Sequence, residues 1–275
     1  MNGSANAGTS PYSRFTISLP NYLSPTVEFH DSMTNTELVI SLHKSPFSAL
    51  SSTAPYPVEH HNPKLTVPVA PTIESYYQNF KIFVYELRTS NSNFFAHYSY
   101  VGNAPSESTY NLIDAHFLTH QSMAYSYFKR SLTYKFTYPV YWLSYDIKTK
   151  RELKLPLVYG KLAYCRLYEK FVISQPLFKL LYDQYKTFEG HVGIYSYGAV
   201  NSFSRFDTQD AVINFFANSQ LDFCDAYCLM EILINYPHTE NCFWNNDNII
   251  TPILDTENAK IVQMKHKYNA YHSKV

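Results

Sequence analysis

Three polar residues in one short stretch have types and spacing that could support chemistry. Glu74, Gln78 and Lys81 are separated by four and then three residues, so on a helix they would share one stripe. A carboxylate, an amide and an ammonium group on one face could bind a polar ligand or steady a developing positive charge. The same spacing is typical of the solvated face of an ordinary amphipathic helix, and periodicity alone favours that simpler interpretation.

The element that must position these side chains is predicted to be a helix over residues 72–86. Pro71 precedes it, and proline suits the first turn of a helix. Apolar residues recur at helical spacing on its other side, at Ile73, Tyr76 or Tyr77, Phe80 and Val84. This helix would therefore pack one face against a core and leave Glu74 on another.

The overall composition limits the classes of partner. The chain has 275 residues, enough for one large domain or two small ones with a buried core. The chain has 22 basic residues (lysine plus arginine) and 22 acidic ones (aspartate plus glutamate), so its formal net charge is zero. A general electrostatic hold on nucleic acid or on an acidic membrane is therefore not expected, although a local basic patch stays open. No run of eighteen apolar residues occurs, and the first residues do not resemble a signal peptide, so we expect no membrane span.

Aromatic residues are unusually frequent, with 26 tyrosines and 19 phenylalanines. Such amphipathic rings suit cores with a wet edge, contacts between subunits, or stacking on a flat ligand, and an AT-rich genome produces the same bias. Only 7 glycines are present, so no phosphate-cradling loop is expected. The motif G-x-S-x-G is also absent from the sequence, which gives no support to a serine nucleophile.

The cysteines and histidines give no complete metal site. Cys224 and Cys228 are four residues apart and could supply half of a site, but no second pair has a matching spacing. His60 and His61 adjoin each other in a proline-rich loop without an evident third ligand. We therefore predict buried packing thiols, no metal and no cofactor. The low cysteine content makes a reducing compartment, cytoplasmic or nuclear, the expected location.

The order of predicted elements indicates an α+β fold rather than an alternating β-α-β sheet. Strands are predicted at 14–19, 27–30, 37–43 and 191–197, and a strand or a hairpin is predicted at 133–146. Helices are predicted at 112–130, 157–172, 208–218, 223–236 and, as a short element, 258–266, with one more that Ser174 caps. Residues 148–154 are assigned to an exposed first turn or a surface loop. We expect three parts: an N-terminal extension at 1–35, partly disordered, a compact domain at 36–240 and a C-terminal tail at 241–275.

Several segments, taken in order, resemble the NADAR superfamily of NAD- and ADP-ribose-associated N-glycosidase-like domains. SPFSALSSTAPYPV (45–58) resembles its phosphate-side loop, and LTVPVAPTIESYYQNFKIF (65–83) is similar to its pattern P-S-V-E-H-Y-Y-Q-A-x-K-F. AYCRLYEKFVISQPLFKLL (163–181), HVGIYSYGA (191–199) and CDAYCLMEIL (224–233) follow in the order of the family. Similar versions occur in proteins of large DNA viruses.

The resemblance implies a small mixed sheet surrounded by helices and a site for a ribosyl phosphate or an ADP-ribosyl compound. It implies that Glu74 is the catalytic carboxylate in cleavage of an N-glycosidic bond. The residues that it implies for substrate binding are Ser45, Phe47, Ser48, Tyr77, Gln78 and Lys81.

Three departures from the family pattern leave turnover open. Ala49 replaces an asparagine, Ser75 replaces a histidine, and residues 196–198 offer no acidic residue where the family has one before Trp-Gly. The protein could therefore bind its ligand without hydrolysing it. The competing class is a non-enzymatic viral structural or interaction protein, in which tyrosines line contacts between subunits. A homo-oligomer stays open under either interpretation.

Several other polar residues are assigned structural roles. His191 begins a strand, and Asp207 and Asp210 lie where a helix cap is expected. Asp225 and Glu231 are predicted to be helix residues for which the sequence shows no partner.

Overall fold

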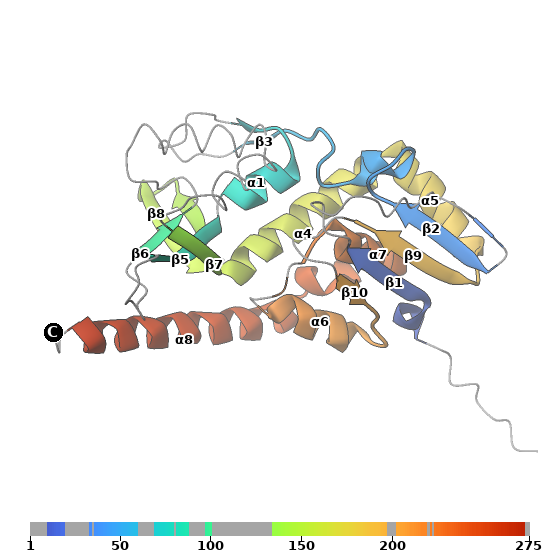
Figure 1. Cartoon of the computed structure of the whole chain (residues 1–275). Helices are drawn as coiled ribbons and strands as arrows, with labels where there is room; N and C mark the ends of the chain where they lie inside the picture. Colours follow the sequence, from blue (N-terminus) through green and yellow to red (C-terminus); the bar gives the residue numbers. More distant parts are fainter. Residues whose placement is uncertain are drawn as a thin grey trace, which may run out of the picture. The chain divides into compact units, whose positions relative to one another are not determined.

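The computed structural model describes only part of the 275-residue chain. It covers residues 10–19, 33–34, 36–59, 69–79, 81–87, 97–100, 134–196, 202–218, 221 and 223–272. The chain divides into two compact units, of which the first comprises Met1–Ser51 and Glu169–Asn245 and the second Ser52–Tyr168 and Asn246–Val275. Helices and sheets occur in both units, and the α+β class is confirmed (Figure 1).

The first unit is built on a four-stranded sheet with the order β10-β1-β9-β2. Its strands are β1 (Phe15–Leu19), β2 (Glu37–Ser41), β9 (His191–Tyr195) and β10 (Ser202–Ser204). The central strand β9 is parallel to both β1 and β2, while β10 pairs with β1 in the antiparallel sense. The strands predicted at 14–19, 37–43 and 191–197 are therefore confirmed to within two residues at either end.

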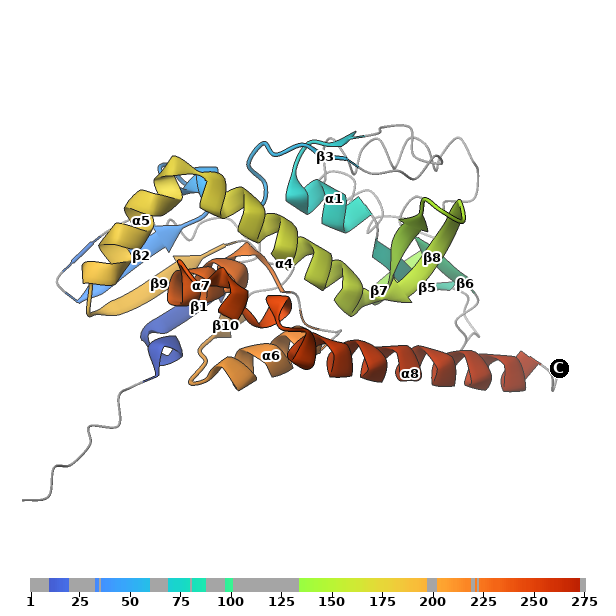
Figure 2. The same cartoon turned by 180° about the vertical axis from the view of Figure 1, so that it is seen from behind.

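One face of this sheet forms the core of the first unit. Its apolar residues face the same side because they are in register across three strands, and all are almost completely buried: Phe15, Ile17, Leu38, Ile40, Val192 and Ile194. The ring of Phe15 lies 5.6 Å from that of Tyr185 in helix α5 (Pro176–Thr187). Helix α7 (Asp225–Asn235) contacts β1 and β9 and lies in front of them in Figure 2 but behind them in Figure 1.

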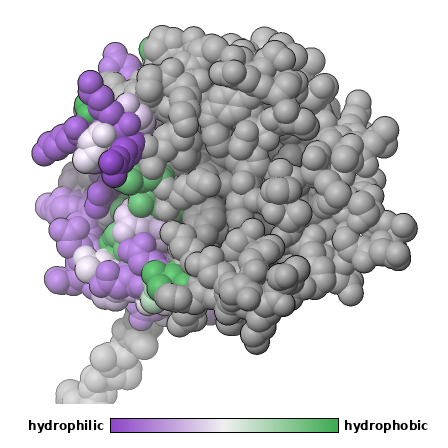
Figure 3. Space-filling model, turned by 90° about the vertical axis from the view of Figure 1, so that its left-hand side faces the viewer, coloured by the Kyte–Doolittle hydropathy of each residue, from purple (hydrophilic) through white to green (hydrophobic). Residues whose placement is uncertain are grey.

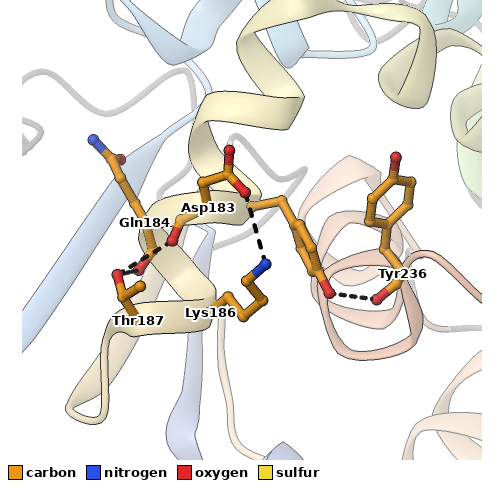
Figure 4. A network of polar contacts seen from close by, with 6 residues as sticks. Asp183, Gln184, Lys186, Thr187 and Tyr236 are labelled. Carbon is orange, nitrogen blue, oxygen red and sulfur yellow. Dashed lines mark hydrogen bonds and ion pairs between the residues drawn. The ribbon is translucent and has the colours of Figure 1, made fainter.

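Helix α5 shows how local residues fix the ends of an element. It begins with Pro176 after Gln175 at the N-cap, not after the predicted cap Ser174, whose hydroxyl donates instead to the carbonyl of Phe171 at 2.6 Å. In its last turn the Thr187 hydroxyl donates to the carbonyls of residues 183 and 184, as Figure 4 shows. Tyr182 donates at 2.7 Å to the carbonyl of residue 236, which ties α5 to the end of α7.

The remaining helices of the first unit follow the predicted pattern. Helix α6 (Gln209–Ala217) begins after Thr208, whose side chain accepts from the N–H of Ala211 at 3.2 Å. Helix α4 (Leu157–Ser174) belongs to the second unit up to Tyr168 and to the first unit from Glu169. The helices predicted at 157–172, 208–218 and 223–236 are confirmed.

The second unit has a four-stranded antiparallel sheet with the order β6-β5-β7-β8. Its elements are β3 (Val58–Glu59), β4 (Val69–Ala70), α1 (Ile73–Asn79), β5 (Lys81–Leu87), β6 (His97–Tyr100), β7 (Tyr134–Asp146), β8 (Arg151–Pro156) and α8 (Asp247–His272). Strands β3 and β4 form a separate short antiparallel pair, and α8 contacts β8. Of the strand and the hairpin predicted at 133–146, β7 confirms the strand.

Three sequence-based predictions about this unit are wrong. The helix expected over 72–86 ends at Asn79, because the following run KIFVYEL is dominated by β-branched and aromatic residues that favour a strand. Residues 151–156 form β8 instead of a loop, after a turn in which Lys150 has a φ of 56°. The short helix expected at 258–266 is the 26-residue α8, which starts where the Asn246 side chain accepts from the N–H of Asn248 at 3.0 Å.

Some predictions lie outside the described residues. These are the strand at 27–30, the helix at 112–130, and the histidines His60 and His61. Within the described part of the chain, no helix is long and apolar enough to cross a membrane.

Candidate functional site

Glu74 lies in the first turn of α1 in the second unit, and its neighbours explain why a helix begins there. The Thr72 hydroxyl accepts from the backbone N–H of Ser75 at 3.0 Å and donates to the Ser75 hydroxyl at 2.9 Å. A backbone hydrogen bond from Tyr76 to the carbonyl of residue 72 closes the turn at 3.1 Å. The side chain of Glu74, immediately before the capped Ser75, is half-buried.

Two hydrogen bonds to Ser52 hold Glu74 in place. The Ser52 hydroxyl donates to Oε2 of Glu74 at 3.2 Å, and the backbone N–H of Glu74 donates to the Ser52 carbonyl at 3.1 Å. Ser52 itself is buried. The carboxylate is therefore fixed by a partner 22 residues away while part of the side chain remains accessible to solvent.

Buried aromatic rings surround the base of α1. The ring of Tyr77 lies 5.1 Å from that of Tyr164 in α4, and Tyr164 stacks on Tyr168 with an interplanar angle of 6°. On the same helix, Tyr76 meets Trp142 edge to face at 5.9 Å, and burial raises the pKa of Tyr76 to about 12. These contacts make α1 a rigid support for Glu74.

A buried lysine on α4 belongs to the same unit and was not singled out by the sequence. Lys161 is only 1% exposed, and it lies three residues before Tyr164 on the same side of the helix. Lysine is almost never fully buried unless its charge is matched, so a lysine at this depth marks a polar interior. The available signal was its place in the apolar stripe of 157–172, where a solvated lysine would not be expected.

The other predicted substrate-binding residues are distributed over both units. Ser45, Phe47 and Ser48 belong to the first unit, in and before the short helix η2 (Phe47–Leu50); Ser45 is exposed, Phe47 buried and Ser48 half-buried. Gln78 lies in α1, while Lys81 is the first residue of β5, and the side chains of both lie outside the described part of the structure. The helical stripe expected to join Glu74 to Lys81 is therefore not formed.

The first unit contains a buried polar cluster that the sequence did not reveal. Asp225 is 2% exposed, and its carboxylate accepts from the Ser196 hydroxyl at 2.6 Å and from the Ser51 hydroxyl at 3.1 Å. His43 hydrogen-bonds with the backbone of Ser196. Burial lowers the pKa of His43 below its ordinary value, although the negative charge of Asp225 opposes this shift.

This cluster gathers at the carboxyl ends of two parallel strands. His43 follows β2, Ser196 follows β9, and Asp225 opens α7. Open parallel sheets tend to bind ligands at this edge. The sequence at 196–198 lacks the acidic residue that the family resemblance calls for, and Asp225 supplies a carboxylate to Ser196 from another element.

Glu231 is a second buried carboxylate of the first unit, and its partners indicate a structural role. Its oxygens accept from the side chains of Tyr12, Gln209 and Asn235 and from the backbone N–H of Phe243, over distances of 2.5 to 3.3 Å. Burial raises the pKa of Glu231, and these donors oppose the rise. Because α7 is apolar on all sides, both of its acidic residues had to be buried and hydrogen-bonded, which is the signal that sequence reasoning missed.

The described residues contain no group of three or more histidine, cysteine or acidic side chains that could hold a metal ion. Cys228 is buried within α7, and Cys224 is the half-buried residue before it. All four cysteines are described, and none forms a disulfide. Their predicted role as packing thiols is compatible with these positions.

Comparison of the chain with protein-family models, with curated proteins and with solved structures found no match.

Proposed function

We propose that the protein binds a ribosyl phosphate or an ADP-ribosyl compound beside Glu74 and hydrolyses its N-glycosidic bond. The observation that carries the proposal is the Glu74 carboxylate, which Ser52 fixes while the side chain stays partly exposed. The order of the NADAR-like segments supports the same function. The fixed aromatic base under α1 adds to this support, because a catalytic group must hold its position to within a fraction of an ångström.

The chemistry asked of Glu74 is electrostatic. When the bond between ribose C1′ and the base nitrogen breaks, its electron pair goes to the nitrogen and positive charge develops on the ribose. A fixed carboxylate stabilises that charge and accepts a proton from the water whose oxygen bonds to C1′. The leaving nitrogen takes up a proton, so the products are free base and a ribose carrying a hydroxyl group.

The competing function, a non-enzymatic protein whose tyrosines line contacts between subunits, has less support. No tyrosine whose side chain is described is exposed; each is buried or half-buried. The face seen in Figure 3 shows mainly hydrophilic residues among those coloured, with small hydrophobic areas between them. Cores with a wet edge account for these tyrosines better than subunit contacts do.

Titration calorimetry tests the proposed binding. ADP-ribose, NAD and a pyrimidine ribose phosphate are titrated into the protein at concentrations that can detect millimolar dissociation constants. We expect at least one of them to bind, and Glu74→Ala to weaken that binding by about tenfold, because a carboxylate accepts strong hydrogen bonds from ribose hydroxyls.

Glu59→Ala is the matched control, because Glu59 is an exposed glutamate of the same unit on β3. It should leave the dissociation constant unchanged. Absence of heat with all three compounds would contradict the proposal, as would equal effects of the two alanine variants.

A further inference from the structure

The second face of the sheet in the first unit carries a row of polar side chains. Strand residues alternate between faces, so Thr16, His191 and Glu37 lie opposite the apolar core residues. Arg205 directly follows β10, and its side chain reaches this face at Thr16. In Figure 1 the strands lie in front of α7, so this second face is the one turned toward the viewer.

Hydrogen bonds join three members of this row. The Arg205 guanidinium donates from Nε to Oγ1 of Thr16 at 3.1 Å, and the same oxygen lies 2.7 Å from Nε2 of His191. A threonine hydroxyl has one hydrogen and two acceptor lone pairs, so Oγ1 can hydrogen-bond with both groups at once. A single buried hydroxyl therefore fixes both a guanidinium and an imidazole on one face.

Arg205 is held in place but keeps most of its hydrogen-bonding capacity. Its guanidinium carbon lies 5.3 Å from the ring centroid of Phe203, and the hydrogen bond to Thr16 uses only the Nε–H. Within the described residues, no acceptor contacts its two terminal nitrogens, and the nearby Asp207 forms no ion pair with it. Two terminal NH2 groups in a plane match the oxygens of a phosphate or a carboxylate.

Phe203 offers an apolar surface beside this guanidinium. It is 63% exposed, although it is a large apolar residue on a strand of three residues at the edge of the sheet. Arg205 covers one side of the ring, as cation–π contacts do. An exposed ring fixed next to an open guanidinium suits a ligand that combines an anionic group with a flat apolar part.

The other end of the row lies near the opposite edge of the sheet. Glu37 and His191 are direct neighbours on β2 and β9, and β2 is three strands away from β10, so about 14 Å of sheet separates the backbone of Glu37 from that of β10. The Glu37 side chain extends over β9, where a Cβ added at Gly193 would come 3.4 Å from Oε1 of Glu37 and 3.1 Å from the ring of Tyr195. Within the described residues, Glu37 forms no ion pair with Arg205.

We propose that Arg205 and Phe203, positioned by Thr16 and His191, form a binding site for a phosphate-bearing aromatic ligand. Arg205 binds the phosphate through its terminal nitrogens, and the ring of the ligand packs on Phe203. This site belongs to the first unit and does not involve Glu74. The proposal for this site does not depend on the proposed hydrolysis.

Calorimetry with phenyl phosphate, inorganic phosphate and phenol separates the two contributions. We expect phenyl phosphate to bind most tightly, inorganic phosphate more weakly and phenol most weakly. Arg205→Ala should weaken the binding of both phosphates by about tenfold or more, because a charge-assisted pair is lost. Phe203→Ala should remove the advantage of phenyl phosphate over inorganic phosphate and leave the latter unchanged.

Two further variants make the result decisive. Arg151→Ala removes one exposed positive charge elsewhere and should leave phenyl phosphate binding unchanged. Arg205→Lys keeps the charge but loses the planar fork, so it should bind phosphate more weakly than the native protein. Thermal melting monitors folding, and if Arg205→Ala does not fold, Arg205→Lys and Phe203→Ala decide.

The imidazole of His191 provides a second readout by NMR. Burial and the charge of Arg205 lower the pKa of His191, while Glu37 raises it. An anion bound to Arg205 offsets that positive charge, so saturating phenyl phosphate should move the pKa of His191 upward. No binding at millimolar ligand, equal binding by the native protein and Arg205→Lys, or no upward shift at saturation would overturn the proposal.

Discussion

Replacing Tyr12 by phenylalanine should lower the free energy of unfolding by about 2 kcal/mol, because hydrogen bonds to charged groups contribute roughly 1.5–3 kcal/mol. Tyr12, in the short helix η1 (Pro11–Arg14), donates at 2.8 Å to Oε2 of Glu231, which is 0% exposed. Phenylalanine keeps the buried ring but removes this donor. The described contacts of Glu231 then retain donors on Oε1 but lose the one on Oε2.

Tyr182→Phe is the matched control, because its hydroxyl donates at 2.7 Å to a neutral backbone carbonyl from a half-buried position. We expect it to cost about 1 kcal/mol, the usual contribution of a neutral hydrogen bond. Urea unfolding at pH 7 measures both values, and equal slopes with denaturant would show that only stability differs. If Tyr12→Phe costs no more than Tyr182→Phe, Glu231 is not the charged acceptor that this reasoning requires.

The pH dependence gives a second test with a definite sign. Burial raises the pKa of Glu231 above its ordinary value of 4.5. Between pH 4.5 and the folded pKa, the folded state therefore holds more protons than the unfolded state. The contribution of Glu231 to stability is therefore complete below pH 4.5 and is lost as the pH rises through the folded pKa. The Tyr12 hydroxyl favours the ionised form, so Tyr12→Phe raises this pKa further. Its cost should grow from pH 4.5 to pH 8, and a constant cost would contradict the argument.

Two further predictions concern packing and metal. Gly160→Ala places a Cβ 2.5 Å from two ring atoms of Trp142, so it should lower the free energy of unfolding by about 1–3 kcal/mol in thermal or urea unfolding. The control Ala163→Gly on the same helix should cost no more than about 1 kcal/mol. Unchanged stability of Gly160→Ala would refute the close contact. Protein purified without chelator should contain no stoichiometric zinc by metal analysis, because Cys228 is a buried packing residue, and one zinc per chain would disprove this role.

Local pattern predicted the elements whose signals agree with each other. The run at 37–43 has β-branched residues at its centre and became β2, and the stripe over 157–172 became α4. The stretch 72–86 failed because its apolar spacing fitted a helix while its second half, KIFVYEL, has strand propensity. Periodicity alone could not decide between a helix and a strand for this second half, whereas its antiparallel pairing with β7 makes it a strand.

The polar contacts of the candidate sites could not be read from sequence spacing. Asp225 meets Ser51 across 174 residues, and Tyr12 meets Glu231 across 219, so only the topology brings them together. Glu74 could be selected from the sequence, but its partner Ser52 could not. Phe203 lies in an edge strand of three residues, which is too short for periodicity to detect, and Arg205 directly follows that strand.

The central claim is that the Glu74 carboxylate assists cleavage of an N-glycosidic bond, and the rate of base release tests it most directly. Release of free base is measured for the native protein, Glu74→Gln and the exposed control Glu59→Gln, with thermal melting to verify folding. We predict that Glu74→Gln lowers the rate by about a hundred- to a thousandfold, the usual effect of removing one electrostatic stabiliser, and that Glu59→Gln changes it less than about twofold. An unchanged rate in Glu74→Gln, or no release by the native protein from any compound that it binds, would contradict the claim.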